Sequence, residues 1–395
     1  MRPKNLPENP DRDQESVLPL PEGEGRGEGE GGAGDSTTTS FRAAPSLNRR
    51  MFLKSGTWSV AALGVTGAGV AIAEYVSRRN RLAASGAGDN PFAYDLTHLT
   101  KTDPSLIHYK EVARFSCPRA EPKRIALNHD NQVFVAAGNY ISVMDRNGGV
   151  ISEIALTAPA RALALASDGL IYASLRDHIE VFAPKGQRLA SWTSPGPRTW
   201  LSGLATSESE LFAADAGHRV VLRYDRSGKL LGRIGEKSRE RDIPGFVVPS
   251  PFFDLELARD GLLRITNPGR HRVEAYTIDG DFEFAWGKAS AAIEGFCGCC
   301  NPISVLLLSD GRCVTCEKGL PRVKVYTADG ALESVVAGTE TFPENARVSA
   351  KDEAEGTHGG LDAAVDSEGR IYILDTVAKD IRVMAKKSTD TSTSA

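Results

Sequence analysis

The chain has 395 residues, a formal net charge of −4 and 25% charged residues. This small negative charge gives no strong electrostatic attraction to nucleic acid, so we expect no nucleic-acid partner. Hydrophobic residues at 41% and aromatic residues at 7% are ordinary for a soluble globular protein. Beyond residue 76 no apolar segment is long enough to span a bilayer.

Residues 1–47 are rich in glycine, proline and charged residues, and residues 21–32 are almost entirely glycine and charged side chains. A segment of this composition cannot bury a core. We predict that it is a disordered low-complexity leader. The alternative, which stays open, is translated non-coding sequence ahead of the true start.

Residues 48–54 read Asn-Arg-Arg-Met-Phe-Leu-Lys, and a glycine-diluted apolar run follows over residues 55–73. The pair Arg49 and Arg50 ahead of such a run resembles the signal of the twin-arginine export machinery. The resemblance implies that residues 48–76 are a signal segment and that the twin-arginine translocase is a partner. It also implies a periplasmic or otherwise exported protein that crosses the membrane already folded.

Two fates are open for this segment. Ala71 and Ala73 form a signal-peptidase site that predicts cleavage before Glu74. Without cleavage, residues 55–73 anchor the protein, and this segment is then its contact with the membrane. We favour cleavage, because the arginines beyond the run fit poorly on the translocated side of a membrane span. Residues 77–108 are predicted to be a linker.

A unit of three strands recurs six times along the rest of the chain. Each unit has an apolar strand, a turn with Asp-Gly or a relative, an alternating strand, a polar turn and a third strand. The third strands end at residues 144, 182, 224, 276, 326 and 384. Such a period predicts an all-β fold, a six-bladed β-propeller over residues 109–386, followed by a disordered tail over residues 387–395.

The blades carry turns of the Asp-x-x-Gly kind and then a (His/Asn)-Arg-Val segment, seen best at residues 218–220 and 271–273. In this they resemble NHL repeats. The resemblance implies the propeller fold and leaves the function open, since propellers have many activities.

The sixth unit lacks a fourth strand, whereas residues 110–115 form a strand with no unit of its own. We predict that this N-terminal strand completes the last blade as its outer strand. The pairing would close the ring and remove both open sheet edges.

A cysteine-rich loop lies between the fourth and fifth blades and contains Cys297, Cys299 and Cys300. Cys316 ends the second strand of the fifth blade, so we expect it to return to this loop. Cys313 lies three residues earlier and points to the other side of the sheet, as a core residue. The predicted metal ligands are Cys297, Cys299, Cys300 and Cys316.

Other residues are expected on the same face of the ring. Cys117 and His358 stand at equivalent strand beginnings in other blades, and Glu317 and Lys318 directly follow Cys316. We regard all four as additional ligands or as lining of a site.

Three interpretations of the cysteines stay open. They form disulfides, with Cys297 to Cys300 or either one to Cys316 as feasible pairs. They bind zinc or an iron–sulfur cluster, which an already folded protein could load in the cytosol before export. Or they are free thiols with redox or nucleophilic chemistry.

His218 and His271 occupy the first position of the repeat segment, where they cap a turn. Alternatively, they hold a zinc ion at the channel mouth together with His178 and His358, as the resemblance to NHL-type amidating lyases implies.

The expected function is therefore that of an exported β-propeller that acts as a binding or redox-associated protein. A small molecule or a protein is expected at the loop face. The alternatives are a propeller-type lyase or hydrolase with a metal at the channel mouth, and an interaction scaffold with structural disulfides.

Overall fold

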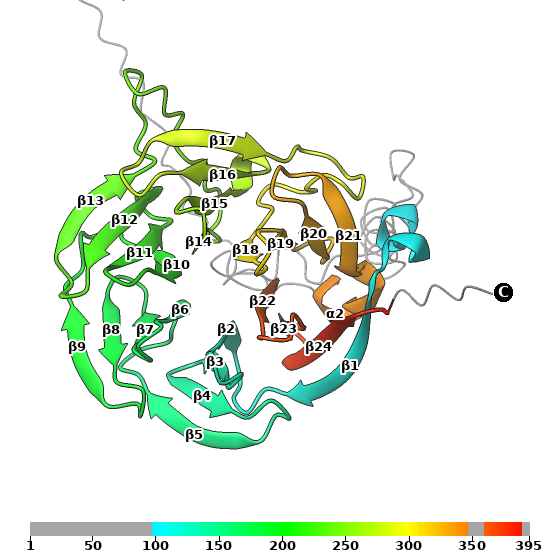
Figure 1. Cartoon of the computed structure of the whole chain (residues 1–395), viewed down its shortest axis with the longest axis horizontal. Coiled ribbons are helices and arrows are strands. Elements are labelled where there is room, and N and C mark those ends of the chain that lie inside the picture. The colour runs from blue at the N-terminus through cyan, green and yellow to red at the C-terminus, as the bar shows by residue number, and fades with distance from the viewer. Residues whose placement is uncertain (1–96, 347–358, 389–395) are drawn as a thin grey trace, which may run out of the picture. The chain divides into compact units, whose positions relative to one another are not determined.

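The computed structural model describes residues 97–346 and 359–388. In this part of the chain, strands β1 to β24 pair into six antiparallel four-stranded sheets. Figure 1 shows the sheets side by side around a ring, each with its first strand near the centre. The expected six-bladed β-propeller is confirmed.

The first three sheets are given from the innermost to the outermost strand. The first contains β2 (Pro122–Leu127), β3 (Val133–Ala137), β4 (Tyr140–Met144) and β5 (Val150–Ala155). The second contains β6 (Ala162–Leu165), β7 (Ile171–Ser174), β8 (Ile179–Phe182) and β9 (Arg188–Trp192). The third contains β10 (Leu201–Thr206), β11 (Glu210–Asp215), β12 (Val220–Asp225) and β13 (Leu230–Ile234).

The last three sheets follow the same order. The fourth contains β14 (Leu255–Leu257), β15 (Leu263–Asn267), β16 (Arg272–Tyr276) and β17 (Phe282–Trp286). The fifth contains β18 (Ser304–Leu307), β19 (Cys313–Cys316), β20 (Val323–Tyr326) and β21 (Leu332–Ala337). The sixth contains β22 (Leu361–Val365), β23 (Ile371–Asp375), β24 (Asp380–Lys386) and β1 (Tyr109–Ser116).

Strand β1 comes from the N-terminal side of the ring and pairs antiparallel with β24, from Tyr109 opposite Lys386 to Ser116 opposite Asp380. The first and last strands of the propeller therefore share one sheet.

The helices are short. They are η1 (Thr97–Thr100), η2 (Pro104–Leu106), η3 (Pro268–Arg270), η4 (Thr339–Thr341) and α2 (Pro343–Ala346). None of the helices in residues 97–346 and 359–388 has the length and apolar character needed to cross a membrane. The predicted leader, the signal segment with Arg49 and Arg50, and His358 lie outside the described residues.

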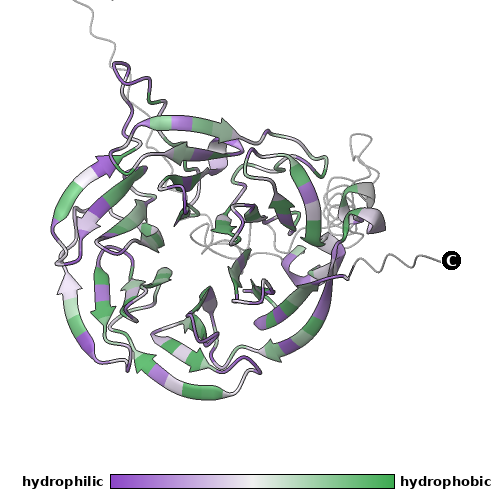
Figure 2. Cartoon of the chain, viewed as in Figure 1, coloured by the Kyte–Doolittle hydropathy of each residue, from purple (hydrophilic) through white to green (hydrophobic). Residues whose placement is uncertain are grey.

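Burial follows the position of a strand within its sheet. The middle strands, such as β3 and β23, are buried along their whole length, since sheets pack on both of their faces. The outer strands, such as β5 and β9, are largely exposed. Figure 2 shows the same contrast, with outer strands that mix hydrophilic and hydrophobic residues.

Aromatic side chains join neighbouring sheets. Trp286, at the end of β17, packs against Tyr326 of the next sheet with ring centroids 4.7 Å apart. Trp192 packs against Tyr224 in the same way at 5.4 Å. Each tryptophan lies under a turn glycine of the following sheet, Gly330 or Gly228, where an added Cβ atom would lie 2.3 Å or 2.7 Å from the indole side chain.

We expect Gly330→Ala to destabilise the fold far more than Gly311→Ala. Both glycines end a turn with φ near +90°, so alanine costs about 1–2 kcal/mol at either position. Around Gly311 an added Cβ atom has nothing within 4 Å, whereas at Gly330 it clashes with Trp286 and adds about 1–3 kcal/mol. Urea unfolding of the two variants measures the difference, and equal losses would contradict this packing.

Candidate functional site

The channel at the centre of the ring holds a buried charge cluster. Arg124 donates to Asp254 at 2.6 Å and lies 3.3 Å from Asp362. Both carboxylates are almost fully buried, at 3% and 6% side-chain exposure. Burial lowers the pKa of Arg124, but the two carboxylates outweigh that effect and raise it. The guanidinium therefore stays charged and links the first, fourth and sixth sheets.

Backbone groups and a hydroxyl complete the environment of the two carboxylates. Asp362 accepts hydrogen bonds from Ile125 N at 2.8 Å and from Ser304 Oγ at 3.0 Å. Asp254 accepts from Val305 N at 3.2 Å. A buried ion cluster requires such hydrogen bonds, because each carboxylate lone pair without a partner costs free energy.

Repetition explains why the cluster forms at one level of the channel. Asp254 and Asp362 occupy the same position of the repeat, at the same distance before a turn glycine. The other four sheets place Arg124, Ala162, Gly203 and Ser304 there. An added Cβ atom at Gly203 would lie 2.7 Å from Asp254 Oδ1, so the small residue leaves room for the carboxylate.

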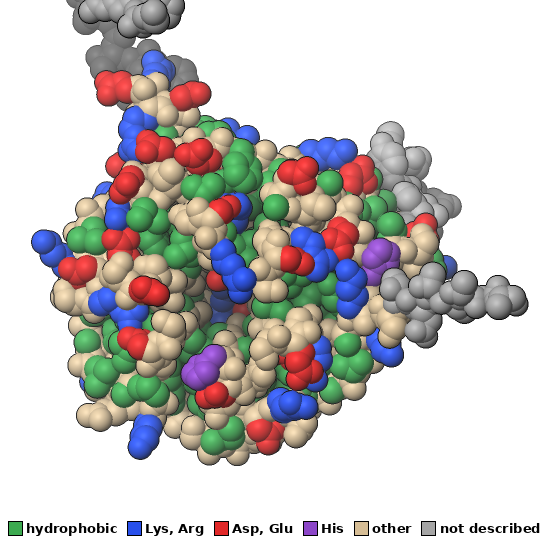
Figure 3. All heavy atoms as spheres, in the orientation of Figure 1, with side chains coloured by type: hydrophobic (Ala, Val, Ile, Leu, Met, Phe, Trp, Pro, Cys, Tyr) green, Lys and Arg blue, Asp and Glu red, His purple; other side chains and the backbone are tan. Residues whose placement is uncertain are grey.

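Below this level the inner strands of all six sheets line a cavity of about 200 Å³. Glu256 of β14 faces this cavity, two residues after Asp254. Burial raises the pKa of Glu256 to about 8, and the charge of Asp254 adds to the shift. Figure 3 shows the hollow at the centre of one face of the ring.

Above the cluster a second pocket forms the channel mouth, with a volume of about 60 Å³. Its lining residues come mostly from segments that lead into the inner strands. They are Lys123, Arg124, Arg161, Trp200, Ser202, Pro251, Phe252, Phe253, Ile303, Gly359, Gly360, Leu361, Asp362 and Thr376. Asp362 is the one acid among these lining residues, and it is ion-paired with Arg124.

Basic and aromatic side chains stack at this mouth. The Arg161 guanidinium lies 5.0 Å from the centre of the Trp200 ring, and that of Arg176 lies 4.6 Å from it. Nε of Arg161 is buried without a hydrogen-bond partner. Burial lowers the pKa of Lys123, and the charge of Arg161 lowers it further. Two guanidinium groups therefore stack on one indole ring at the mouth.

The cysteine-rich loop lies beside the mouth. Cys299 is exposed, Cys297 is half-buried and Cys300 is buried, and all three are free thiols. The Cys299 thiol donates to the Cys300 sulfur at 3.7 Å. Asn301 then fixes the base of the loop, since its amide donates to the carbonyl oxygens of Cys297 at 2.5 Å and Lys318 at 2.8 Å.

Cys316 was expected beside this loop, but its side chain lies elsewhere. Its backbone does return there, since Ile303 N donates to Cys316 O at 2.9 Å. Its side chain is buried among the channel charges, where burial, Asp362 and Asp254 raise the thiol pKa. In residues 97–346 and 359–388 no three Cys, His, Asp or Glu side chains are arranged to hold a metal ion. A zinc or iron–sulfur site at these cysteines stays a prediction.

Two other cysteines lie in the core. Cys313 is fully buried beside Trp286 and Phe296, which confirms the expected core position. Cys117 is half-buried and packs against the core of the sixth and first sheets. Burial raises the pKa of the Cys117 thiol to about 12, so it is protonated at neutral pH.

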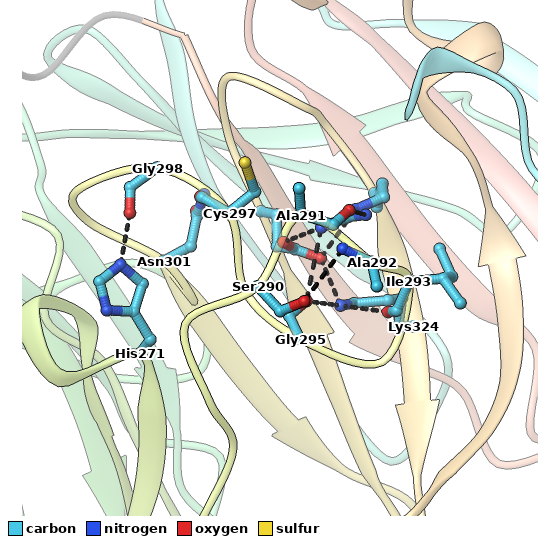
Figure 4. Close-up of polar contacts among 12 residues, drawn as sticks. His271, Ser290, Ala291, Ala292, Ile293, Gly295, Cys297, Gly298, Asn301 and Lys324 are labelled. Atoms are coloured by element: carbon cyan, nitrogen blue, oxygen red, sulfur yellow. Dashed lines mark hydrogen bonds and ion pairs between the residues drawn. The ribbon is translucent and has the colours of Figure 1, made fainter. Parts of the chain in front are cut away.

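Glu317 was expected to line a site, but it is a core residue. It is fully buried and pairs with Arg322 at 2.7 Å and with Lys324 at 2.8 Å. Lys324 also donates to the carbonyl oxygens of Ile293 at 2.9 Å and Gly295 at 2.7 Å. Figure 4 shows Lys324 pointing into the segment that leads to the cysteine-rich loop. Glu317 therefore supports the loop through Lys324.

Lys318 connects the loop with the mouth. Its backbone N donates to the Asn301 side chain at 2.9 Å. Its ammonium group lies 4.5 Å from the centre of the Phe252 ring, which lines the mouth pocket.

The described histidines have separate partners. His218 forms a 2.6 Å contact from Nδ1 to the buried carboxylate of Asp215. His271 Nε2 is hydrogen-bonded to Gly298 O, as Figure 4 shows. His178 Nδ1 lies 2.8 Å from Asp177. Each histidine is thus tied to its own blade or the next, and these three do not assemble a ligand set.

No family model and no curated protein matches this chain. Solved structures do resemble it. A streptogramin B lyase structure has a TM-score of 0.49 and 14% identity, and the match covers 71% of this chain and 97% of that one. Selenomethionine-substituted virginiamycin B lyase from Staphylococcus aureus has a TM-score of 0.46 and 13% identity, and the match covers 70% of this chain and 99% of the lyase. A catalytically inactive form of that lyase with quinupristin has a TM-score of 0.48 and 14% identity, and the match again covers 70% of this chain and 99% of the lyase.

The channel cluster and the mouth with Arg161 and Trp200 were not predicted from the sequence. A signal was present, because Arg124, Asp254 and Asp362 interrupt apolar inner strands at one repeat position. Aligning the six units at that position would have shown an arginine opposed to two acids. Arg161 and Trp200 had no comparable signal, since both lie outside the repeated pattern.

We expect Arg124→Met to lower the free energy of unfolding by about 3–5 kcal/mol, because it leaves two buried carboxylates without a cation. Adding Asp254→Asn and Asp362→Asn should restore part of that loss. Arg119→Met is the control, since it removes an exposed pair with Glu153 and costs at most about 1 kcal/mol. Urea unfolding that shows equal losses for Arg124 and Arg119 would refute the role of the cluster.

We expect Glu256→Gln to change how stability depends on pH. The folded-state pKa of Glu256 is raised to about 8, so its protonation stabilises the fold below its ordinary pKa near 4.5 and this contribution is lost as pH rises through 8. The variant should therefore gain stability over the wild type between pH 5 and pH 9. Glu283→Gln, on exposed β17, is the control and should show no such trend in urea unfolding.

Proposed function

We propose that this propeller is a binding protein that holds a small anionic organic ligand at the channel mouth. The observation that supports it is the mouth pocket, in which the Arg161 guanidinium lies against Trp200 and its buried Nε has no hydrogen-bond partner.

Arg161 favours an anion. Asp362, the acid among the described lining residues, is ion-paired with Arg124. The buried Nε of Arg161 has no hydrogen-bond partner, and a carboxylate or a similar oxyanion accepts from such a group with high affinity. The ligand therefore carries at least one acid group.

Shape and apolar surface favour an organic ligand over an inorganic ion. The pocket of about 60 Å³ has room for a few waters or for one acid group. Trp200 and Phe252 line the pocket and add aromatic surface against which an apolar part of the ligand can pack.

We further propose that the protein is an NHL-type propeller exported through the twin-arginine route. The arginine pair Arg49 and Arg50 and the repeat segments at residues 218–220 and 271–273 support this assignment. An exported location would expose the mouth to ligands outside the cytoplasm.

We expect aromatic carboxylates to bind more tightly than the corresponding neutral amides. Arg161→Gln should weaken carboxylate binding at least about tenfold, because a hydrogen bond to a charged group contributes about 1.5–3 kcal/mol. Trp200→Ala should weaken both members of each pair. Titration calorimetry with benzoate, indole-3-acetate and their amides measures these affinities.

Arg233→Gln is the matched control, since Arg233 is an exposed arginine on outer strand β13 and should leave binding unchanged. Binding should also weaken as salt is added. Equal affinity for acid and amide, or no binding of either acid, would overturn the proposed function.

A further inference from the structure

Two adjacent thiols are in contact on the cysteine-rich loop. Sγ of Cys299 lies 3.7 Å from Sγ of Cys300. A disulfide needs about 2.05 Å between sulfur atoms. Between adjacent residues it also closes a small ring that includes the peptide bond, so the loop backbone must twist as the sulfur atoms approach. Cys299 is exposed, whereas Cys300 is buried at 4% exposure. One thiol can therefore meet a partner in solution while the other stays protected.

The loop is held at its base and open at its tip. Asn301, which directly follows the pair, is hydrogen-bonded to the main chain of Cys297 and Lys318. Gly298, which directly precedes the pair, is hydrogen-bonded through its carbonyl oxygen to His271. At Gly298, which is exposed, an added Cβ atom would meet nothing closer than Asn301 Nδ2 at 3.8 Å. Cys299 thus has space to turn toward Cys300.

The different exposure of the two thiols sets their order of reaction. Exposed Cys299 can meet a disulfide in solution, whereas buried Cys300 can reach the sulfur atom of Cys299 beside it.

We propose that Cys299 and Cys300 are a redox-active vicinal pair that exchanges with disulfides of small thiols or of other proteins. The Cys299 thiolate attacks one sulfur of the oxidant and releases the first thiol. The Cys300 thiolate then attacks Sγ of Cys299 and releases the second thiol. The pair loses two protons and two electrons as one S–S bond forms, and the oxidant disulfide takes them up and becomes two thiols.

This assignment differs from each of the three disulfide pairings that the sequence allowed. Cys316 is buried with the channel charges and Cys297 is half-buried, whereas Cys299 and Cys300 are in contact. The reaction uses no residue that lines the mouth pocket, so this proposal and the proposed anion binding fail separately.

Oxidised glutathione is the probe. After reaction with the folded, reduced protein, trypsin releases residues 289–312, which hold Cys297, Cys299 and Cys300, and separately residues 313–318, which hold Cys316. We expect the first peptide to lose two hydrogens in mass spectrometry without keeping glutathione, and dithiothreitol to reverse the change.

Cys297→Ser should behave like the wild type, and so should Cys117→Ser on another blade. Cys300→Ser should instead trap glutathione on Cys299, and Cys299→Ser should neither form the disulfide nor trap glutathione. Circular dichroism shows whether each variant is folded. The proposal is overturned if the two peptides are cross-linked, if Cys297→Ser prevents the loss of hydrogens, if glutathione stays on the wild type, or if no reaction occurs.

Discussion

The ring closes around one buried cation, and the candidate site depends on it. Arg124 of the first sheet reaches Asp254 of the fourth sheet across the channel and Asp362 of the neighbouring sixth sheet. Because buried carboxylates need a partner, the three inner strands must keep this spacing. The cluster also forms the floor of the mouth pocket, since Arg124 and Asp362 line both the mouth and the cavity below it. Arg124 is engaged within the cluster, and Arg161 supplies a guanidinium to the mouth itself.

A second buried cation positions the cysteine-rich loop, again through a buried ion pair and hydrogen bonds. Lys324 is completely buried and is paired with Glu317, and its remaining hydrogen bonds go to the carbonyl oxygens of Ile293 and Gly295. These oxygens lie just before the loop, so the loop starts from a fixed point. From there Asn301 ties it to Lys318, which stacks on Phe252 at the mouth. Loop and mouth are thus two parts of one face.

The fold could be read from the sequence because its determinants are local and repeated. Alternating apolar residues and turn glycines define each strand, and a count of strands placed residues 110–115 beside the last sheet, where β1 pairs with β24. Alternation also placed Cys313 in the core. It failed for Cys316, because its charged neighbours Asp254 and Asp362 come from other sheets. It also failed for Glu317, because alternation does not show that two cations of the same sheet bury it as an ion pair. The partners Arg124 and Asp254 are 130 residues apart, so only closure of the ring brings them together.

Differences among the six copies carry the chemistry of this propeller. At one position of the repeat the second and third copies have alanine and glycine, whereas the first, fourth and sixth copies have Arg124, Asp254 and Asp362. The connection between β17 and β18 likewise has an insertion with three cysteines that the repeat does not need. A residue shared by all copies must serve packing in six equivalent places, whereas a residue unique to one copy is free of that requirement. Functional residues in a repeat fold are therefore best sought where the repeat is broken.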